Sequence, residues 1–243
     1  MKFSVIIPAH NEEKFIGRTV ELLSKQTISR QDYEIIVVDA GSLDATSRVA
    51  KAAGADKVIS GTSAGTNFAR QKGVLTSKGE IVAFLDADCE PRIDWLERIS
   101  RDLAIPGVAA VSGPYDYGFR GLARFFDRFY SRVILAKSDK ILPFLFGRRS
   151  GVILGGNFGA RRSIIEKIGG LPPLRFWGDD AATAMMISRK AGRVLFDPDL
   201  IVGSSPRRFE REGMLKSVLR YMRAYLKVYF IKEEKDYVLL NRL

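Results

Sequence analysis

Apolar residues along the chain fall into short continuous runs, and between these runs they recur at every third or fourth position. Continuous runs are typical of strands buried on both faces of a sheet, and the longer recurrence is typical of helices packed against it. The runs predict strands at residues 3–7, 33–38, 57–60, 81–85, 108–112 and 194–196, and residues 152–158 contain a glycine-rich approach to a further strand. The intervening pattern predicts helices near residues 15–25, 44–54, 64–79, 95–103, 161–168, 181–191 and 214–230. Strands that alternate with helices predict an α/β fold with a mostly parallel central sheet.

Carboxylates follow the apolar run at residues 81–85. Asp86 and Asp88 come directly after it, and Glu90 continues the series. Because side chains alternate along an extended chain, we expect all three to point the same way, at the sheet edge where open α/β folds bind ligands. Asp39 ends an earlier strand at the same edge. Converging carboxylates repel one another unless a cation lies among them, and hard oxygen ligands suit Mg²⁺ or Mn²⁺. A solvated acidic turn is the alternative interpretation of so short a motif.

A second acidic pair, Asp179 and Asp180, precedes the predicted helix at 181–191. Carboxylates are favoured at a helix N-terminus by its free N–H groups and its dipole. Capping the helix requires only one of these two carboxylates. The pair is therefore a candidate for a catalytic role.

The net charge of +11 is localised. Residues 118–150 and 205–232 each contain eight basic and two acidic residues, so together they carry +12 and the rest of the chain carries −1. Phe and Leu accompany these charges, and an arginine stands at every fourth position from Arg120 to Arg132. The pattern predicts peripheral attachment to an anionic membrane surface. A core helix with a solvated face, or a subunit interface, would give the same pattern.

Cysteine and histidine each occur once, as Cys89 and His10. This excludes an internal disulfide and any site built from several cysteines or histidines. No apolar run is long enough to span a bilayer, and the first one is too short for a secretory signal. We therefore expect a cytoplasmic protein, peripheral on the inner face of the cell membrane.

Six segments, in this order, resemble landmarks of the inverting family 2 glycosyltransferases of the GT-A fold. They are VIIPAHNEE (5–13), VVDAGSLDAT (37–46), ARQKG (69–73), FLDADCEP (84–91), GGNFGARRSIIEKIGG (155–170) and WGDDAATAMMISRKAG (177–192). The resemblance covers about residues 1–200. The chain departs from the family pattern at Ala40, where a second Asp is usual, and at Gln71, where Asn is usual. It also lacks the Gln-x-x-Arg-Trp segment of the processive synthases, which favours transfer of a single sugar.

The resemblance implies a Rossmann-like GT-A fold for transfer from a nucleotide-diphosphate sugar, with flanking helices and a C-terminal amphipathic helix. Residues 1–200 would form one catalytic domain, with a nucleotide-sugar-binding half at 1–105 and an acceptor-binding half at 106–200. Residues 201–243 would form a basic helical extension. The implied reaction is metal-dependent, inverting transfer of one sugar to a lipid-linked or glycan acceptor, with Mg²⁺ or Mn²⁺ as cofactor.

The resemblance also implies roles for individual residues. Asp180 would be the catalytic base, with Asp179 orienting it or the acceptor, although these two roles could be exchanged. Asp88 would hold the metal, assisted by Asp86 and Glu90. The nucleotide sugar would be bound by Pro8, Ala9, Glu12, Asp39, Arg70, Asp86 and Ala87. Arg207 and Arg208 would approach the donor diphosphate or a phosphorylated acceptor, or else form a solvated basic loop.

Other classes of protein fit less well. A sugar-1-phosphate nucleotidyltransferase would carry a Gly-rich loop with Arg and Lys after the first strand, where residues 8–11 are PAHN. A non-catalytic protein that binds nucleic acid or a membrane would explain the basic charge but not the carboxylate motifs. An inactive scaffold would explain the fold but not these motifs. The charge lies outside the motif-rich half and accompanies apolar residues, so we expect no nucleic-acid partner. No motif identifies the sugar, the nucleotide base, the acceptor or the oligomeric state.

Overall fold

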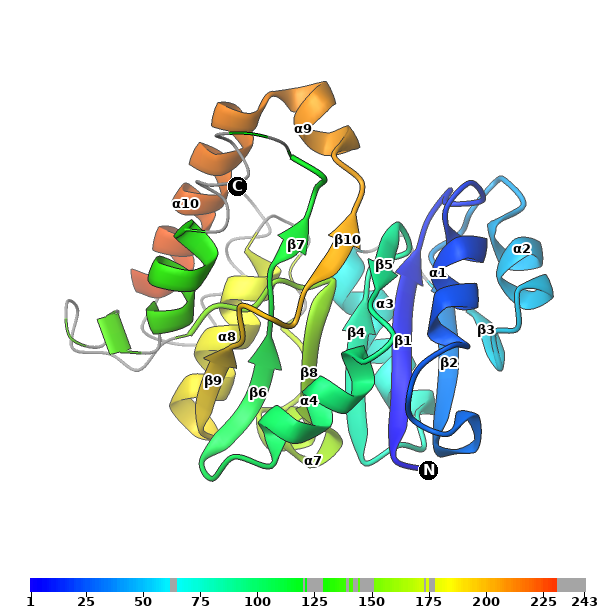
Figure 1. The fold of residues 1–243 in the computed structure, drawn as a ribbon, viewed down its shortest axis with the longest axis horizontal. Coiled ribbons are helices and arrows are strands. Elements are labelled where there is room, and N and C mark those ends of the chain that lie inside the picture. The colour runs from blue at the N-terminus through cyan, green and yellow to red at the C-terminus, as the bar shows by residue number, and fades with distance from the viewer. Residues whose placement is uncertain are drawn as a thin grey trace.

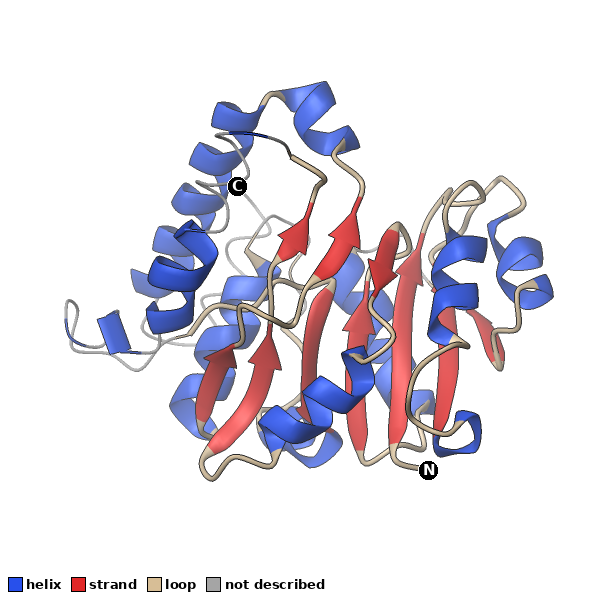
Figure 2. Ribbon diagram, in the orientation of Figure 1, coloured by secondary structure: helices blue, strands red, loops and turns tan. Residues whose placement is uncertain are grey.

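The computed structural model describes residues 1–61, 65–119, 121, 129–138, 140–141, 144, 151–172, 174 and 178–230. A seven-stranded sheet with the order β3-β2-β1-β4-β8-β6-β9 runs through the molecule (Figures 1 and 2). Its strands are β1 (Phe3–Ala9), β2 (Tyr33–Asp39), β3 (Lys57–Ser60), β4 (Ile81–Leu85), β6 (Val108–Ser112), β8 (Asn157–Arg161) and β9 (Arg193–Phe196). Only β8 runs antiparallel to its neighbours in this sheet. The predicted α/β fold with a mostly parallel sheet is therefore confirmed.

A three-stranded sheet lies near the carboxyl ends of the parallel strands (Figure 1). It consists of β5 (Cys89–Pro91), β10 (Val202–Ser204) and β7 (Tyr115–Asp116). None of these short strands was predicted from the apolar pattern, because a strand of two or three residues leaves no readable period. The small sheet brings the segment after β4 next to the segment before the C-terminal helices.

Helices cover both faces of the large sheet. The helices of the described residues are α1 (Ile16–Leu23), α2 (Thr46–Ala52), α3 (Thr66–Thr76), α4 (Trp95–Leu103), α7 (Arg162–Lys167), α8 (Asp179–Lys190), α9 (Arg207–Glu212) and α10 (Met214–Phe230), with short 3₁₀ or π turns at Arg30–Asp32, Tyr130–Ile134 and Leu135–Lys137. Alternate residues of one strand serve opposite faces. On β1, Ile6 packs in a core with α3, α7 and α8, whereas Val5 and Ile7 pack in a second core with α1 and α4. Burial on both faces explains why the strands are continuously apolar.

The glycine-rich segment at residues 152–158 leads into a strand as expected, because residues 151–156 form a loop and β8 begins at Asn157. The arginine stripe from Arg120 to Arg132 lies largely outside the described residues. Of the helices that are described, none has the length and apolar content to cross a bilayer. The division of the catalytic domain at residue 105 stays a prediction, and β4 and β8 pair across it in one sheet.

The C-terminal helix α10 packs against α8. Its buried residues include Ala224, Val228 and Tyr229. The opposite face is exposed, and its apolar residues are Leu219, Met222, Leu226 and Phe230. Apolar residues on the outer face of a helix, in addition to those on its core face, are typical of a surface that contacts a membrane or another protein.

Candidate active site

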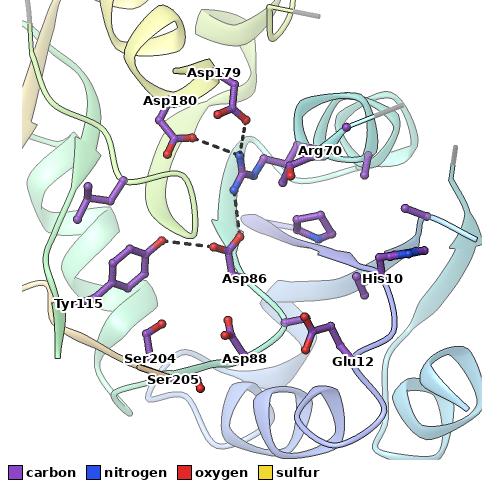
Figure 3. Close-up of a pocket in the computed structure, with 18 of the residues that line it drawn as sticks. His10, Glu12, Arg70, Asp86, Asp88, Tyr115, Asp179, Asp180, Ser204 and Ser205 are labelled. Atoms are coloured by element: carbon purple, nitrogen blue, oxygen red, sulfur yellow. Dashed lines mark hydrogen bonds and ion pairs between the residues drawn. The ribbon is translucent and has the colours of Figure 1, made fainter. Parts of the chain in front are cut away.

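A cavity of about 530 Å³ opens where β1 and β4 end, and residues of the small sheet line it too (Figure 3). It brings together nine of the predicted site residues: Pro8, Ala9, Glu12, Arg70, Asp86, Ala87, Asp88, Asp179 and Asp180. These come from both halves of the chain, because α8 and the loop before β8 reach the same edge of the sheet as β1 and β4. Carboxyl ends of parallel strands are the usual ligand site of open α/β folds.

The guanidinium of Arg70 is the centre of one side of the cavity. Its side chain is 4% exposed and lies 3.0 Å from Asp86 Oδ1, 3.4 Å from Asp180 Oδ1 and 3.5 Å from Asp179 Oδ2 (Figure 3). Burial alone would lower the pKa of Arg70, but the three carboxylates raise it above its usual value. One buried cation thus joins the carboxylate that follows β4 to the pair that opens α8. The sequence predicted a contact between Arg70 and the nucleotide sugar, not this three-way ion pair.

The carboxylates of the α8 pair differ in their surroundings. Burial and the adjacent Asp180 raise the pKa of Asp179 to about 7, although Arg70 opposes this. Asp180 accepts a hydrogen bond from the Gly155 backbone N–H, at 3.0 Å to Oδ2. The Asp180 carboxylate is therefore held by a backbone donor on one side and by Arg70 on the other.

Two consecutive glycines allow the loop before β8 to pass directly against the carboxylates. A Cβ on Gly155 would lie 2.1 Å from Asp180 Oδ1, and one on Gly156 would lie 2.2 Å from Asp86 Cγ. The N–H of Gly156 donates to the Tyr115 hydroxyl at 2.8 Å, and that hydroxyl lies 3.5 Å from Asp86 Oδ2. The close approach leaves no room for a side chain at either position, which accounts for the glycines in the predicted approach to β8.

Asp88 lies at the other end of the cavity. Burial and Asp86 raise the pKa of Asp88, and Arg207 lowers it. The Arg207 guanidinium lies 3.1 Å from Asp88 Oδ2, pairs with Glu12 Oε1 and covers the ring of Phe15 at 4.7 Å. The second oxygen of Glu12 is buried without a hydrogen-bond partner among the described residues. Desolvated carboxylate oxygens of this kind suit Mg²⁺ or Mn²⁺. Within the described chain, however, no three His, Cys, Asp or Glu side chains are grouped closely enough to hold a metal ion.

Two predicted site residues are not among those that line the cavity. Residues 86–88 form a turn, so the alternation that would align Glu90 with Asp86 and Asp88 does not hold. Glu90 instead lies on β5, is 58% exposed and faces Arg18 at 3.8 Å. Asp39 is buried and accepts hydrogen bonds from Ser42 and Ser47. Burial alone would raise the pKa of Asp39, but these hydrogen bonds lower it. A contact of Asp39 with the nucleoside stays a prediction.

Several lining residues were not predicted from the sequence. They are Tyr115, Tyr117, Leu154, Leu174, Ser204, Ser205 and Tyr221. All lie after residue 105, on short strands, loops or α10. Isolated aromatic and aliphatic residues in such segments give no periodic signal, so only the folded arrangement identifies them.

Comparisons with known proteins agree with this geometry. The family model described as "Glycosyl transferase family 2" matches residues 4–169. The glycosyltransferase AglE of Haloferax volcanii is 28% identical over 233 residues, which are 94% of this chain and 74% of that protein. The glucosyl-3-phosphoglycerate synthase of Petrotoga mobilis is 27% identical over 206 residues, 79% of this chain and 62% of that one.

A solved structure shares the fold. The mannosyltransferase PcManGT from Pyrobaculum calidifontis, in complex with GDP-Man and Mn²⁺, superposes with a TM-score of 0.78 at 23% identity. The match covers 96% of this chain and 65% of that one. The family model spans more than half of the present chain and includes the carboxylates after β4. The chain therefore belongs to glycosyl transferase family 2 and is a nucleotide-sugar glycosyltransferase with the GT-A fold.

Proposed function

We propose that the protein transfers one sugar from a nucleotide-diphosphate sugar, with inversion and with a divalent metal, to a lipid-linked or glycan acceptor at the inner face of the cell membrane. The observation that carries the proposal is the distribution of carboxylates in one cavity. Asp86 and Asp88 lie on the side of β1 and β4, and Asp179 and Asp180 lie across Arg70 from them (Figure 3). Donor activation and acceptor activation would each use one of these two groups of carboxylates.

On the donor side, Asp88 with Asp86 would hold Mg²⁺ or Mn²⁺. The metal, when bound, neutralises the charge that develops on the leaving nucleoside diphosphate. Because the described carboxylates do not form a complete cage, donor phosphates and water would supply the other ligands, as is usual for Mg²⁺. The presence of Mn²⁺ in the PcManGT complex supports this assignment. Glu12, and not Glu90, provides the third carboxylate at this end of the cavity.

Glu12 also belongs to the nucleotide side of the cavity, together with Pro8, Ala9 and Ala87. Pro8 and Ala9 end β1 and line the cavity, where their apolar side chains would face the nucleoside. Thr46 fixes this loop, because its hydroxyl accepts the Glu12 backbone N–H at 2.8 Å. The loop after β1 is therefore held in place before a ligand arrives.

On the acceptor side, Asp180 would take the proton from the accepting group. Proton transfer to a positioned carboxylate is general base catalysis, which contributes about 10²–10⁴-fold. Gly155 N–H and Arg70 fix the Asp180 carboxylate, and Asp179 beside it shares the same guanidinium. A single base suffices for an inverting, in-line displacement.

The outer face of α10 supports attachment to a membrane. Leu219, Met222, Leu226 and Phe230 are 40–61% exposed along one side of the helix. Lys216, Arg223 and Lys227 lie next to this stripe on the helical wheel and are exposed too. Apolar residues flanked by basic ones are typical of a helix lying in a membrane interface, where each basic residue contributes about 1 kcal/mol near anionic lipid.

The first experiment is a donor screen by nucleoside diphosphate release, with and without Mn²⁺, using a membrane extract as acceptor. We expect metal-dependent release from one donor, and loss of release in Asp88→Asn and Asp180→Asn. Asp32→Asn, at an exposed carboxylate outside the cavity, is the matched control and should behave as wild type. Absence of release and of donor binding by calorimetry for every donor would show that the proposal is wrong.

Membrane attachment is tested separately by pelleting with vesicles. We expect binding to vesicles containing phosphatidylglycerol and weak binding to phosphatidylcholine alone. The double variant Met222→Ser/Leu226→Ser should lose most of the binding without change in the donor affinity. Equal pelleting of wild type and variant would contradict a role for the α10 stripe.

A further inference from the structure

We infer that Ser112, a buried residue outside the cavity, is a positioning residue for sugar transfer, because its hydroxyl fixes the glycine turn that orients Asp180. The inference rests on the proposed function, in which Asp180 is the base. Ser112 is the last residue of β6, is fully buried and is not one of the residues that line the cavity. It acts on the base through the backbone of Gly155.

The backbone at Gly155 forms a tight turn that leads into β8. The Asn157 N–H donates to the Leu154 carbonyl oxygen at 2.8 Å, so Gly155 and Gly156 are the two central residues of the turn. Glycine has more backbone freedom than any other residue, so two consecutive glycines do not by themselves set the directions of their N–H groups. Contacts from outside the turn are needed to hold it in one conformation.

The Ser112 hydroxyl bridges the two ends of this turn. It accepts the Leu154 N–H at 2.9 Å and donates to the Asn157 carbonyl oxygen at 2.8 Å. These are the two backbone groups that would bond to each other in a regular hairpin, and here the hydroxyl lies between them. A buried hydroxyl is costly without such partners, and this one uses both its donor and its acceptor. The bridge accounts for a serine at the end of the otherwise apolar strand β6.

The far end of the turn is anchored by the Asn157 side chain. Its amide oxygen accepts the Trp95 indole N–H at 2.9 Å. Its amide nitrogen donates to the carbonyl oxygens of Pro114 and Leu200, at 3.1 Å and 2.7 Å. Asn157 is fully buried, so these bonds are shielded from water. The end of the turn to which Ser112 donates is therefore fixed, and the hydroxyl transfers that fixed position to the other end.

The orientation of the turn matters because both of its central N–H groups donate into the site. The Gly155 N–H donates to Asp180 Oδ2 at 3.0 Å, and the Gly156 N–H donates to the Tyr115 hydroxyl at 2.8 Å. That hydroxyl lies 3.5 Å from Asp86 Oδ2 (Figure 3). If the turn reorients, the Asp180 carboxylate loses its backbone donor and its direction. A displacement of about 1 Å at a reacting group can cost about 10²-fold in rate.

Ser4 of β1 provides a matched control for a merely structural hydroxyl. It is also fully buried, and its hydroxyl donates to Glu34 at 2.6 Å and accepts the Gly79 N–H at 2.8 Å. None of these three residues lines the cavity. Ser4→Ala and Ser112→Ala therefore remove the same group from equally buried positions, and both should lower the stability. Only Ser112→Ala should change the site.

The first measurement follows the Gly155 amide by NMR in the full chain. Leu154–Gly155 is the only Leu-Gly pair in the sequence, so leucine labelled at its carbonyl carbon and glycine labelled at its nitrogen give one correlated signal, that of Gly155. An amide proton bonded to a carboxylate resonates downfield and exchanges slowly with water. We expect the signal to move upfield and to exchange faster in Ser112→Ala, and to stay in place in Ser4→Ala. An unchanged Gly155 signal in Ser112→Ala would overturn the inference.

Kinetics then test whether the turn acts on the chemistry. With the donor found in the screen, we expect Ser112→Ala to lower kcat about tenfold and to change the donor affinity, measured by calorimetry, much less. Ser4→Ala should keep the wild-type kcat. A wild-type kcat in Ser112→Ala, or an equal loss of kcat in Ser4→Ala, would overturn the inference.

Ser112→Cys covers the case in which Ser112→Ala does not fold. A thiol has a similar size and is a weak donor and a weak acceptor, so both the kcat and the Gly155 signal of this variant should lie between those of wild type and Ser112→Ala. If Ser112→Ala is unfolded, a wild-type Gly155 signal and kcat in Ser112→Cys would overturn the inference. Failure of the proposed function looks different, because wild type would then release nucleotide from no donor. The NMR comparison would still decide whether Ser112 holds the turn.

Discussion

Replacing Arg70 with Met tests whether one buried cation holds the two sides of the cavity together. Met has a similar length and keeps the apolar stem, but it removes the charge that lies 3.0–3.5 Å from Asp86, Asp179 and Asp180. The three carboxylates then face one another without compensation. We expect a loss of folding stability at neutral pH and a loss of sugar transfer, because the base would no longer be held in place.

The magnitude follows from the burial of the pair. At an effective dielectric constant of about 20, each contact of this length is worth roughly 5 kcal/mol of attraction, most of it offset by desolvation of the guanidinium. Removing one partner of a buried pair costs about 3–5 kcal/mol. Asp86 is 37% exposed, so solvent reduces its share, and we expect about 3 kcal/mol. For a chain of this size that corresponds to a fall in Tm of roughly 6–12 °C.

The assay is thermal and urea unfolding of wild type and Arg70→Met at pH 8 and pH 5. Without Arg70 the pKa of Asp179 rises further, because Arg70 lowers it in the wild type, so lowering the pH protonates Asp179 in the folded state and relieves the repulsion. The stability deficit should therefore be larger at pH 8 than at pH 5. Arg132→Met removes an exposed ion pair with Asp199 and should cost less than about 1 kcal/mol. A deficit in Arg70→Met as small as that control, or one independent of pH, would refute the reasoning.

Three further predictions concern the same cavity. Gly156→Ala should displace the Asp86 carboxylate, which a Cβ would approach to 2.2 Å, and should weaken donor binding by calorimetry. Gly118→Ala has open space for its Cβ but a φ of +70°, so it should lower stability and leave donor binding unchanged. The pKa of Asp179 is about 7 in the folded protein and about 3.9 in the unfolded chain, so between these pH values the folded protein binds one more proton. The free energy of unfolding of the wild type should therefore rise as the pH falls through 7. This rise should be smaller in Asp179→Asn, as measured by urea unfolding. Arg207→Ala should tighten Mn²⁺ binding without nucleotide, since it frees Asp88, and a weaker affinity would contradict that competition.

The large sheet was predictable because its strands are buried on both faces. Ile6 and Val5 enter different cores, yet both must be apolar, so β1 appears in the sequence as an uninterrupted run. The same reasoning located β2 and β4. Motif order then placed Asp88 and Asp180 at one ligand edge, where the structure also has them.

Contacts between distant segments could not be predicted in this way. The turn at residues 86–88 leads directly into β5, which pairs with β10, a strand more than a hundred residues later in the chain. It directs Glu90 towards Arg18 and away from the cavity. The role of Arg70 was missed for a similar reason, because its three partners come from β4 and α8. A sequence motif identifies such residues, but it does not show which charged side chains they contact in the fold.

The reversed strand β8 explains why the acceptor side of the cavity meets the donor side at all. A parallel strand would enter the sheet from the opposite edge and bring its preceding loop there. Because β8 is antiparallel to β4, with Asn157 opposite Leu85, the residue before Asn157 stands against the residue after Leu85. These residues are Gly156 and Asp86, and the Asp86 N–H lies 3.4 Å from the Gly156 carbonyl oxygen. Strand direction and register therefore place the glycine pair on the donor carboxylate. From there Gly155 reaches Asp180. The junction between the two halves is thus a consequence of one strand pairing, and the glycines are the residues that this pairing requires.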